Sequence, residues 1–228
     1  MKLSVAQLGN IEYSQALEMQ NRLLQLRQQG QIEDILLLLE HPPVITVGSR
    51  GLTTNILVSE SYLDSSGVSL YKSNRGGDVT YHGPGQIVGY PILDLKNHGK
   101  DLPKYIRKIE ETFIRLLNNE YQIIAGRDPK HPGVWVGNDK ITAIGCTIKR
   151  WVTMHGFAFN VNTNLEHFSL ITPCGIVDKG VTSLQKLLGH PLNLPSVNQQ
   201  VLKYFAEVFD SDVEILESSQ FNKILEEG

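Results

Sequence analysis

A glycine-rich stretch at residues 74–86 constrains the fold more than any other part of the sequence. It reads NRGGDVTYHGPGQ, so four glycines and a proline fall among thirteen residues. Glycine permits positive φ and lets another group approach the backbone N–H groups closely, whereas a loop that only connects two strands needs one or two turn residues. Arg75 and His82 add side-chain donors beside that backbone. The stretch is therefore predicted to bind a ligand, and not to be a surface turn with incidental polar residues.

The composition fits one α/β domain that covers residues 1–228. Hydrophobic residues make up 41% of the chain and charged residues 20%, which is enough for a normal core. The net charge of -3 argues against nucleic-acid binding. Two cysteines do not suggest a disulfide framework, and they favour a reducing compartment, which we take to be the cytoplasm. No apolar run approaches the ~20 residues of a membrane span, so no membrane association is expected.

Hydrophobic periodicity and turn residues predict a mixture of strands and helices. Strands are expected at residues 2–8, 34–40, 44–47, 68–72, 87–93, 121–125, 133–136, 140–148, 154–161 and 213–216. Helices are expected at residues 13–29, at 101–118 with Asp101 as N-cap, at 181–188, at 196–209 with Ser196 as N-cap, and weakly in the tail, while residues 168–177 are expected to be mostly loop. No linker rich in Pro, Gly or Ser divides the chain. The predicted fold class is therefore α/β (α+β), with a mixed, largely antiparallel sheet and helices packed on it.

The two cysteines lie in different sequence surroundings. Cys174 lies between a proline and a glycine, which favours a loop where a thiol can be reached as a nucleophile. The pattern alone is equally compatible with a small buried side chain in a tight turn. Cys146 alternates with Ile144 and Ile148, so it is predicted to pack in the core. Lys140 opens the same strand after a turn; by itself it could simply point to solvent.

Neither a metal site nor a nucleotide phosphate site is predicted. His82 and His155 have no metal-ligand spacing with another His, Cys or carboxylate. The chain also lacks a GxxxxGK[ST] segment and a clear strand–GxGxxG–helix unit. No cofactor is therefore expected.

Several separate blocks of the sequence resemble one enzyme family, the lipoyl(octanoyl) transferases, which move an octanoyl group from acyl carrier protein to a protein lysine. The resemblance runs from about residue 13 to about residue 188. The matching blocks are RGGDVTYHGPGQ at 75–86, EHPP at 40–43, KITAIG at 140–145, HGFAFNV at 155–161, PCG at 173–175 and VTSL at 181–184. The blocks follow one another in the family's order, which makes the resemblance specific.

The resemblance implies a fold, a catalytic pair and a substrate site. The fold is that of the catalytic domain of biotin and lipoate protein ligases. Cys174 would be the nucleophile that carries the acyl group as a thioester, and Lys140 would lower its pKa and act as base. The acyl and substrate site would consist of Arg75, Gly76, Gly77, Asp78, Val79, Thr80, Tyr81, His82, Ala143, Ile144, Gly145, Gly156, Phe157 and Ala158. Two positions depart from the family's pattern: Thr147 stands where Arg is frequent, and Asn164 where Asp is frequent, which leaves the docking surface and local salt bridges open.

The implied partners are octanoyl-acyl carrier protein as donor and, as acceptors, the lipoyl domains of 2-oxoacid dehydrogenase complexes and the glycine cleavage H protein. The main alternative is an ATP-dependent lipoate or biotin protein ligase of the same fold, which would need to bind an adenylate and would not need a nucleophilic cysteine. A second alternative is a non-catalytic scaffold that binds lipoyl domains. The segment PCG at 173–175 argues against the ligase, and the presence of both Lys140 and Cys174 argues against the scaffold.

Overall fold

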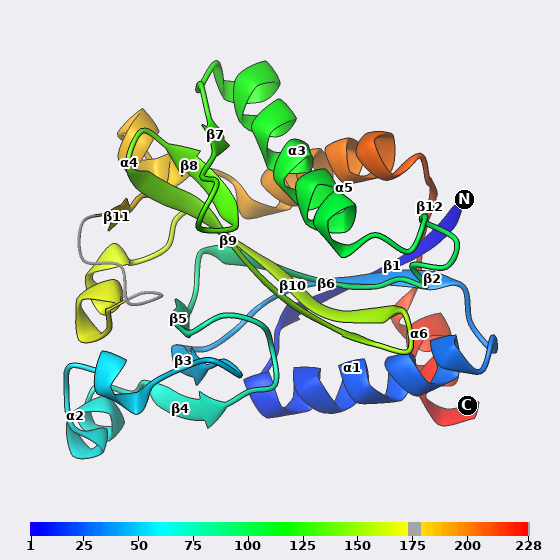
Figure 1. Ribbon diagram of the computed structural model, residues 1–228, viewed down its shortest axis with the longest axis horizontal. Helices are drawn as coiled ribbons and strands as arrows, with labels where there is room; N and C mark the ends of the chain where they lie inside the picture. Colours follow the sequence, from blue (N-terminus) through cyan, green and yellow to red (C-terminus); the bar gives the residue numbers. More distant parts are fainter. Residues whose placement is uncertain (173–178, 228) are drawn as a thin grey trace.

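The computed structural model describes residues 1–172 and 179–227. In these residues a nine-stranded sheet runs through the molecule in the order β12-β1-β2-β6-β10-β9-β8-β7, with β11 beside β9 (Figure 1). Its strands are β1 (Lys2–Asn10), β2 (Asp34–Glu40), β6 (Gln86–Ile92), β7 (Gly126–Arg127), β8 (Gly133–Val136), β9 (Asp139–Lys149), β10 (Val152–Asn160), β11 (Gly180–Val181) and β12 (Asp212–Ile215). β1 pairs in parallel with β2 and β12, and β11 with β9; the other pairs are antiparallel. The prediction of a mixed, largely antiparallel sheet is confirmed.

A second, smaller sheet carries part of the glycine-rich stretch. It has the order β4-β3-β5, with β3 (Val44–Val47), β4 (Ser69–Lys72) and β5 (Val79–His82). The 3₁₀ helix η1 (Thr53–Asn55) and the short helix α2 (Glu60–Ser65) lie between β3 and β4. The stretch is therefore not one continuous loop: β5 pairs with β3 in its middle, and only the residues on either side are irregular.

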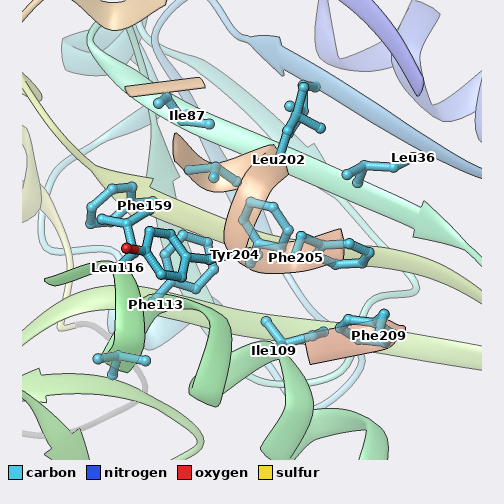
Figure 2. Packing of buried hydrophobic residues seen from close by; sticks show 14 of the residues in the cluster. Leu36, Ile87, Ile109, Phe113, Leu116, Phe159, Leu202, Tyr204, Phe205 and Phe209 are labelled. Atoms are coloured by element: carbon cyan, nitrogen blue, oxygen red, sulfur yellow. The ribbon is translucent and has the colours of Figure 1, made fainter. Parts of the chain in front are cut away.

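Helices cover both faces of the large sheet (Figure 1). On one face lie α3 (Leu102–Tyr121) and α5 (Leu194–Phe209), and on the other α1 (Tyr13–Gln28) and α6 (Ser218–Glu227). Beneath α3 and α5 aromatic rings pack closely: the centroids of Phe113 and Phe159 are 4.9 Å apart, and those of Phe205 and Phe209 are 4.1 Å apart (Figure 2). Aromatic rings remove large apolar areas from water, so this cluster contributes much of the stability of that face.

The ends of the helices follow from local side chains, and they correct two predictions. Asp101 caps α3 as predicted, because its side chain accepts a hydrogen bond from the N–H of Lys104 at 2.9 Å. The predicted strand at 121–125 is wrong: α3 runs to Tyr121 and ends at Gln122, whose φ is +56°, and only two residues of β7 follow. Ser196 is not the cap of α5 either. The cap is Asn193, which accepts from the N–H of Ser196 at 3.0 Å.

The predicted boundaries near the nucleophile loop also change. Within 168–177, the residues up to 170 belong to the 3₁₀ helix η2 (Leu165–Leu170), and residues 173–177 lie outside the described part of the chain. The helix predicted at 181–188 is α4 (Leu184–Leu188); the residues before it pair with β9 as β11. Residues 180 and 181 pair with β9 instead of starting the helix, and the sequence pattern does not reveal a pairing between segments so far apart.

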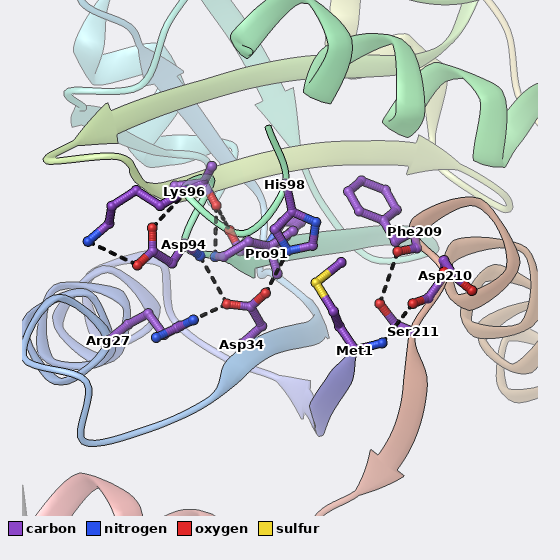
Figure 3. Close-up of polar contacts among 12 residues, drawn as sticks. Met1, Arg27, Asp34, Pro91, Asp94, Lys96, His98, Phe209, Asp210 and Ser211 are labelled. Atoms are coloured by element: carbon purple, nitrogen blue, oxygen red, sulfur yellow. Dashed lines mark hydrogen bonds and ion pairs between the residues drawn. The ribbon is translucent and has the colours of Figure 1, made fainter. Parts of the chain in front are cut away.

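A buried carboxylate joins α1, β2 and the loop after β6 (Figure 3). Asp34 accepts from Arg27 Nε at 2.7 Å, from a ring nitrogen of His98 at 2.7 Å and from the N–H of Asp94 at 2.9 Å. Burial by itself would raise the pKa of Asp34, but the hydrogen bonds from His98, the Asp94 N–H and Arg27 outweigh it and the pKa is lowered from 3.8. Asp34 therefore ties three segments together as a carboxylate.

We predict that Asp34→Asn lowers the free energy of unfolding by about 3 kcal/mol at neutral pH, because it leaves the buried Arg27 without its counter-charge. The difference from wild type should shrink as pH falls below 3.8, since a carboxylate with a lowered folded-state pKa stabilises the fold only above its unfolded pKa. Urea denaturation at several pH values measures both effects. Glu214→Ala, which removes an exposed ion pair with Lys2, is the control and should cost less than about 1 kcal/mol. Equal losses for the two variants would contradict the account.

Candidate active site

One cavity of about 550 Å³ brings most of the predicted site residues together. It lies where the glycine-rich stretch faces β9 and β10, and α1 and α3 also contribute to its wall. The predicted residues that line it are Arg75, Gly76, Gly77, Asp78, Thr80, His82, Lys140, Ala143, Ile144, Gly145, Gly156, Phe157 and Ala158. Residues distant in the sequence thus meet at one site, whose volume is in the range of small-molecule pockets.

Val79 and Tyr81, which the resemblance also implies for the substrate site, do not line this cavity. Successive side chains of a strand point to opposite faces. In β5, Thr80 and His82 face the cavity, so Val79 and Tyr81 face the other way and are buried in the core of the small sheet. The hydroxyl of Tyr81 is 2.7 Å from Nδ1 of His167. The side chains of Val79 and Tyr81 therefore anchor the glycine-rich stretch to the core of the small sheet.

The glycine-rich stretch lies directly against β9. The N–H of Gly76 donates to the carbonyl of Cys146 at 3.1 Å. A Cβ on Gly76 would be 2.8 Å from that carbonyl oxygen, and a Cβ on Gly145 would be 2.7 Å from the carbonyl oxygen of Gly76. Side chains are therefore excluded on both sides of this contact, at Gly76 in the stretch and at Gly145 in β9. The paired glycines are required for close packing of backbone on backbone as well as for any ligand.

Arg75 is held by the small sheet. Its Nε donates to Thr46 Oγ1 at 3.0 Å, its Nη2 to the carbonyl of Thr46 at 2.6 Å, and its Nη1 to the carbonyl of Gly76 at 3.1 Å. The residue is buried, so its charge acts on neighbouring groups at short range. Arg75 thus fixes the loop and supplies positive potential at the same time.

Four aromatic or imidazole side chains form another part of the wall, and the predicted site included only His82 among them. Tyr13, Tyr90 and His155 line the cavity with it. Behind them, His41 donates from Nδ1 to the carbonyl of Ile11 at 2.6 Å, so its Nε2 accepts from the Tyr90 hydroxyl at 2.7 Å. The wall residues come from α1, β5, β6 and β10, and His41 directly follows β2. No single sequence motif contains all of them.

The imidazoles of this wall are uncharged at neutral pH. Burial lowers the pKa of His41 to about 4. Burial, followed by the charges of Arg75 and Lys149, lowers the pKa of His155 to about 3. Burial also lowers the pKa of His82 well below 6.5, with His41 and Arg75 adding to the effect. The wall therefore disfavours positive charge.

Lys140 stands near the start of β9, at the rim of the same cavity. Its Nζ donates to the carbonyl of Pro132 at 3.3 Å and lies 4.7 Å from the ring centroid of Trp135. The ammonium of Lys179 lies 4.6 Å from the same ring and pairs with Asp128. Cation–π contacts favour the charged form of a lysine at a defined position. Trp135 therefore holds two lysine side chains at one place.

Cys174, the predicted nucleophile, lies outside the described residues. The described chain resumes at Lys179 and then pairs with β9: Val181 is in register with Lys140, and the N–H of Thr182 donates to the carbonyl of Lys140 at 3.0 Å. Residues 180–182 are thus anchored beside the predicted base.

Cys146 has two environments. It packs against the apolar cluster beneath α3 and α5, as predicted for a core residue, and it also lines the cavity. Burial raises the pKa of its thiol to about 12. The thiolate, which is the reactive form, is therefore nearly absent at neutral pH.

The two departures from the family's pattern have local hydrogen-bonding roles. The hydroxyl of Thr147 donates to the carbonyl of Asn74 at 2.5 Å, which adds a second link between β9 and the glycine-rich stretch. Asn164 caps η2 by accepting from the N–H of Glu166 at 3.0 Å. Neither residue lines the cavity.

The described residues include no group of three His, Cys, Asp or Glu side chains arranged to hold a metal ion. Within the same part of the chain, no helix combines the length and the apolar character needed to span a bilayer.

Comparison with known proteins identifies the family. Residues 12–206 match the family model described as the lipoyl protein ligase A/B catalytic domain. An octanoyltransferase from Desulforamulus reducens is 62% identical over 225 residues, which cover 99% of each chain, and an octanoyltransferase from Caldicellulosiruptor saccharolyticus is 55% identical over 99% of this chain and 96% of its own. The chain therefore belongs to the lipoyl protein ligase A/B catalytic domain family and, within it, to the octanoyltransferases.

Solved structures agree on the fold. A crystal structure of lipoate-protein ligase A bound with ATP superposes with a TM-score of 0.75 and covers 100% of this chain and 94% of its own, at 14% identity. The biotin protein ligase of Aquifex aeolicus gives a TM-score of 0.53 at 14% identity, over 92% of this chain and 69% of its own. The predicted fold of biotin and lipoate protein ligases is confirmed.

We predict that Cys146 resists iodoacetamide in the folded protein from about pH 7 to about pH 9, because its raised pKa leaves almost no thiolate. Cys146→Val, which nearly conserves volume, should cost less than about 1.5 kcal/mol of stability. Peptide mapping after alkylation of folded and unfolded protein measures the reactivity, with the unfolded sample as control. Alkylation of Cys146 in the folded protein at the rate of a free thiol would refute the assignment.

Proposed function

We propose that this chain transfers an octanoyl group from acyl carrier protein, through a thioester on Cys174, to a lysine of lipoyl domains, with Lys140 as counter-ion and base. The observation that carries the proposal is the pairing of residues 180–182 with β9 at Lys140, beside a cavity lined by the glycine-rich stretch. The names of the relatives support the same reaction. The proposal treats residues 1–228 as one catalytic domain.

The cavity suits an acyl chain. Ala143, Ile144, Phe157 and Ala158 give β9 and β10 an apolar surface within it, and Leu102 and Ile106 of α3 extend that surface. An eight-carbon chain that leaves water for such a surface gains roughly 0.8 kcal/mol per buried CH₂. The acyl chain would lie against the strands, with its carbonyl toward the rim where Lys140 stands.

In the first step the Cys174 thiolate attacks the thioester carbonyl of the carrier protein. A new C–S bond forms, the old one breaks, and the carrier thiolate leaves and takes a proton from the charged Lys140, which becomes neutral. The exchange of one thioester for another is nearly isoenergetic, so no nucleotide is consumed. A charged Lys140 stabilises the thiolate, which otherwise is only a few per cent of the population at neutral pH.

In the second step a lysine amine of the lipoyl domain attacks the octanoyl-enzyme. The amine has an ordinary pKa of ~10.4 and must lose a proton to react. That proton passes to solvent; as the neutral amine attacks, Lys140 in its neutral form accepts a second proton from it, the amide bond forms, and the Cys174 thiolate leaves. The regenerated thiolate again pairs with the charged Lys140. One lysine thus serves both steps at different stages.

The proposed donor is octanoyl-acyl carrier protein. The proposed acceptors are the lipoyl domains of 2-oxoacid dehydrogenase complexes and the glycine cleavage H protein. The ATP-dependent ligase remains the alternative on fold alone, since a lipoate-protein ligase bound with ATP has the same fold. The much higher identity to octanoyltransferases favours transfer without a nucleotide.

We predict that octanoyl transfer from carrier protein to an apo lipoyl domain proceeds in nucleotide-free buffer, because a thioester supplies the activated acyl group. Mass spectrometry of the lipoyl domain measures the product. Apyrase treatment of every component is the control, and it should leave the rate unchanged. Strict dependence on added ATP would place the protein with the ligases.

We predict that Lys140→Ala moves the alkylation profile of Cys174 to higher pH, toward the free-thiol pKa of ~8.5, because the thiolate loses its counter-ion. Each pKa unit of that shift corresponds to ~1.4 kcal/mol. The rate of iodoacetamide alkylation against pH, followed at Cys174 by peptide mapping, measures it. Lys72→Ala, which removes one positive charge from the exposed strand β4, is the control. Superimposable curves for wild type and Lys140→Ala would show that Lys140 does not stabilise the Cys174 thiolate.

A further inference from the structure

A buried chain of hydrogen bonds runs from His82 in the cavity wall to the backbone beside Lys140. His82 Nδ1 is 2.8 Å from Gln86 Oε1, and Gln86 Nε2 is 2.9 Å from Asn160 Oδ1. Asn160 Nδ2 is 3.0 Å from the carbonyl of Thr182. All four residues are buried. Thr182 in turn donates its N–H to the carbonyl of Lys140, so the chain links the two ends of the site.

The carbonyl of Thr182, the last acceptor in this chain, fixes the direction of every hydrogen bond before it. A backbone carbonyl cannot donate, so the Asn160 group that faces Thr182 must be the NH₂ and the group that faces Gln86 must be the oxygen. The Gln86 group that faces Asn160 is then the NH₂, which also donates to the carbonyl of Tyr81 at 3.2 Å. The Gln86 oxygen is left to face His82, and His82 Nδ1 must therefore carry a hydrogen. The opposite orientation of either side-chain amide would place one oxygen against another, so these orientations are the ones that the hydrogen bonds allow.

The fixed tautomer leaves Nε2 of His82 as an acceptor. His82 is uncharged at neutral pH, since its pKa lies well below 6.5, so Nε2 keeps its lone pair. Among the described residues Nε2 has no hydrogen-bond partner, and it is not one of the fully buried atoms without one. The side chain lines the cavity, which is where Nε2 is accessible. The cavity thus contains a neutral imidazole nitrogen that can accept a hydrogen bond from a ligand.

We propose that Nε2 of His82 accepts a hydrogen bond from the amine of the incoming lysine, and that Gln86 and Asn160 are positioning residues that hold His82 in the required tautomer. The proposal rests on the proposed function, because that reaction brings an amine to the cavity, whereas an octanoyl chain offers no N–H. Asp78, the one carboxylate that the described residues place on this cavity, already accepts from the Leu52 N–H at 3.1 Å and from Asn55 Nδ2 at 2.5 Å.

The surroundings of His82 suit a neutral amine. Tyr13 stacks on its ring with centroids 6.3 Å apart, and His41 lies 5.7 Å away. Arg75 acts on it through its charge, and no carboxylate of the described residues is among the groups that influence it. An ammonium is disfavoured in such a place, while an uncharged amine can donate one N–H to Nε2 and keep its lone pair for the thioester. The amine is the nucleophile that the second step needs.

The tautomer can be tested without any assumption about the reaction. In protein labelled with nitrogen-15 at histidine, His82 should show a protonated Nδ1 and an unprotonated Nε2, with no titration between about pH 6 and about pH 8. Assignment uses the loss of one signal in His82→Gln. A protonated Nε2, or a charged His82 in that range, overturns the proposal even if octanoyl transfer is confirmed.

The role is tested by measuring the two half-reactions separately in Gln86→Met and Gln86→Glu. Gln86→Met removes the acceptor for Nδ1–H, and the second half-reaction, from octanoyl-enzyme to lipoyl domain, should slow about tenfold, the value of one hydrogen bond. Formation of the octanoyl-enzyme should change less than about twofold. Gln86→Glu keeps the shape but adds a negative charge beside His82, so His82 should become charged and the second half-reaction should rise with pH as that charge is lost.

Asn162→Ala is the matched control, because it removes an amide two residues from Asn160 that, among the described residues, bonds only to the backbone of Leu192. It should change neither the nitrogen-15 signals of His82 nor the ratio of the two half-reactions. A selective loss of the first half-reaction in Gln86→Met would assign the N–H donor to the carrier protein's arm and overturn the proposal. Equal losses in both half-reactions would show that the chain of hydrogen bonds only supports the structure of the site, which would also overturn the proposal. If Gln86→Met does not fold, Gln86→Glu and the wild-type spectrum decide the question.

Discussion

The backbone contact between the glycine-rich stretch and β9 is the constraint on which the rest of the site depends. The N–H of Gly76 reaches the carbonyl of Cys146, and neither Gly76 nor Gly145 has room for a Cβ. This contact places the small sheet against the large one. The cavity, with Arg75 on one wall and β9 on the other, exists because the two sheets meet backbone to backbone at this point.

The site has two ends with opposite electrostatic character. At the rim, Trp135 gathers the ammonium groups of Lys140 and Lys179, and Asp128 holds the second of these. Around His82 and His155, burial and the charge of Arg75 disfavour positive charge. In the proposed reaction the thiolate lies beside Lys140, and the neutral amine attacks the thioester while it is hydrogen-bonded to His82. The buried hydrogen bonds from His82 to Thr182 connect the two ends of the site, so their relative positions are fixed by the fold.

The sequence predicted what local pattern determines. The apolar run of β2, the amphipathic stripe of α3 and its Asp101 cap were all visible as periodicity and capping, and the structure has them. The strand predicted at 121–125 failed because a left-handed residue, Gln122, ends α3 and turns the chain, and helix propensity does not reveal that conformation.

The candidate site was predictable only where a motif marked it. Most of the named residues line one cavity, but Val79 and Tyr81 point away, because a motif does not tell which residues of a strand share a face. Tyr13 and Tyr90 were missed, since no local signal connects α1 to β6. The tautomer of His82 depends on an amide from β10, more than seventy residues away, and only the fold reveals it.

The most direct test of covalent transfer is the intact mass of the protein after it is mixed with octanoyl carrier protein in nucleotide-free buffer. The account predicts a mass increase of one octanoyl group that maps to Cys174 and is lost on treatment with neutral hydroxylamine, as expected of a thioester. The Cys174→Ala variant should show no increase. An unmodified wild-type protein that still transfers octanoyl groups, or an adduct that persists in Cys174→Ala, would contradict the account.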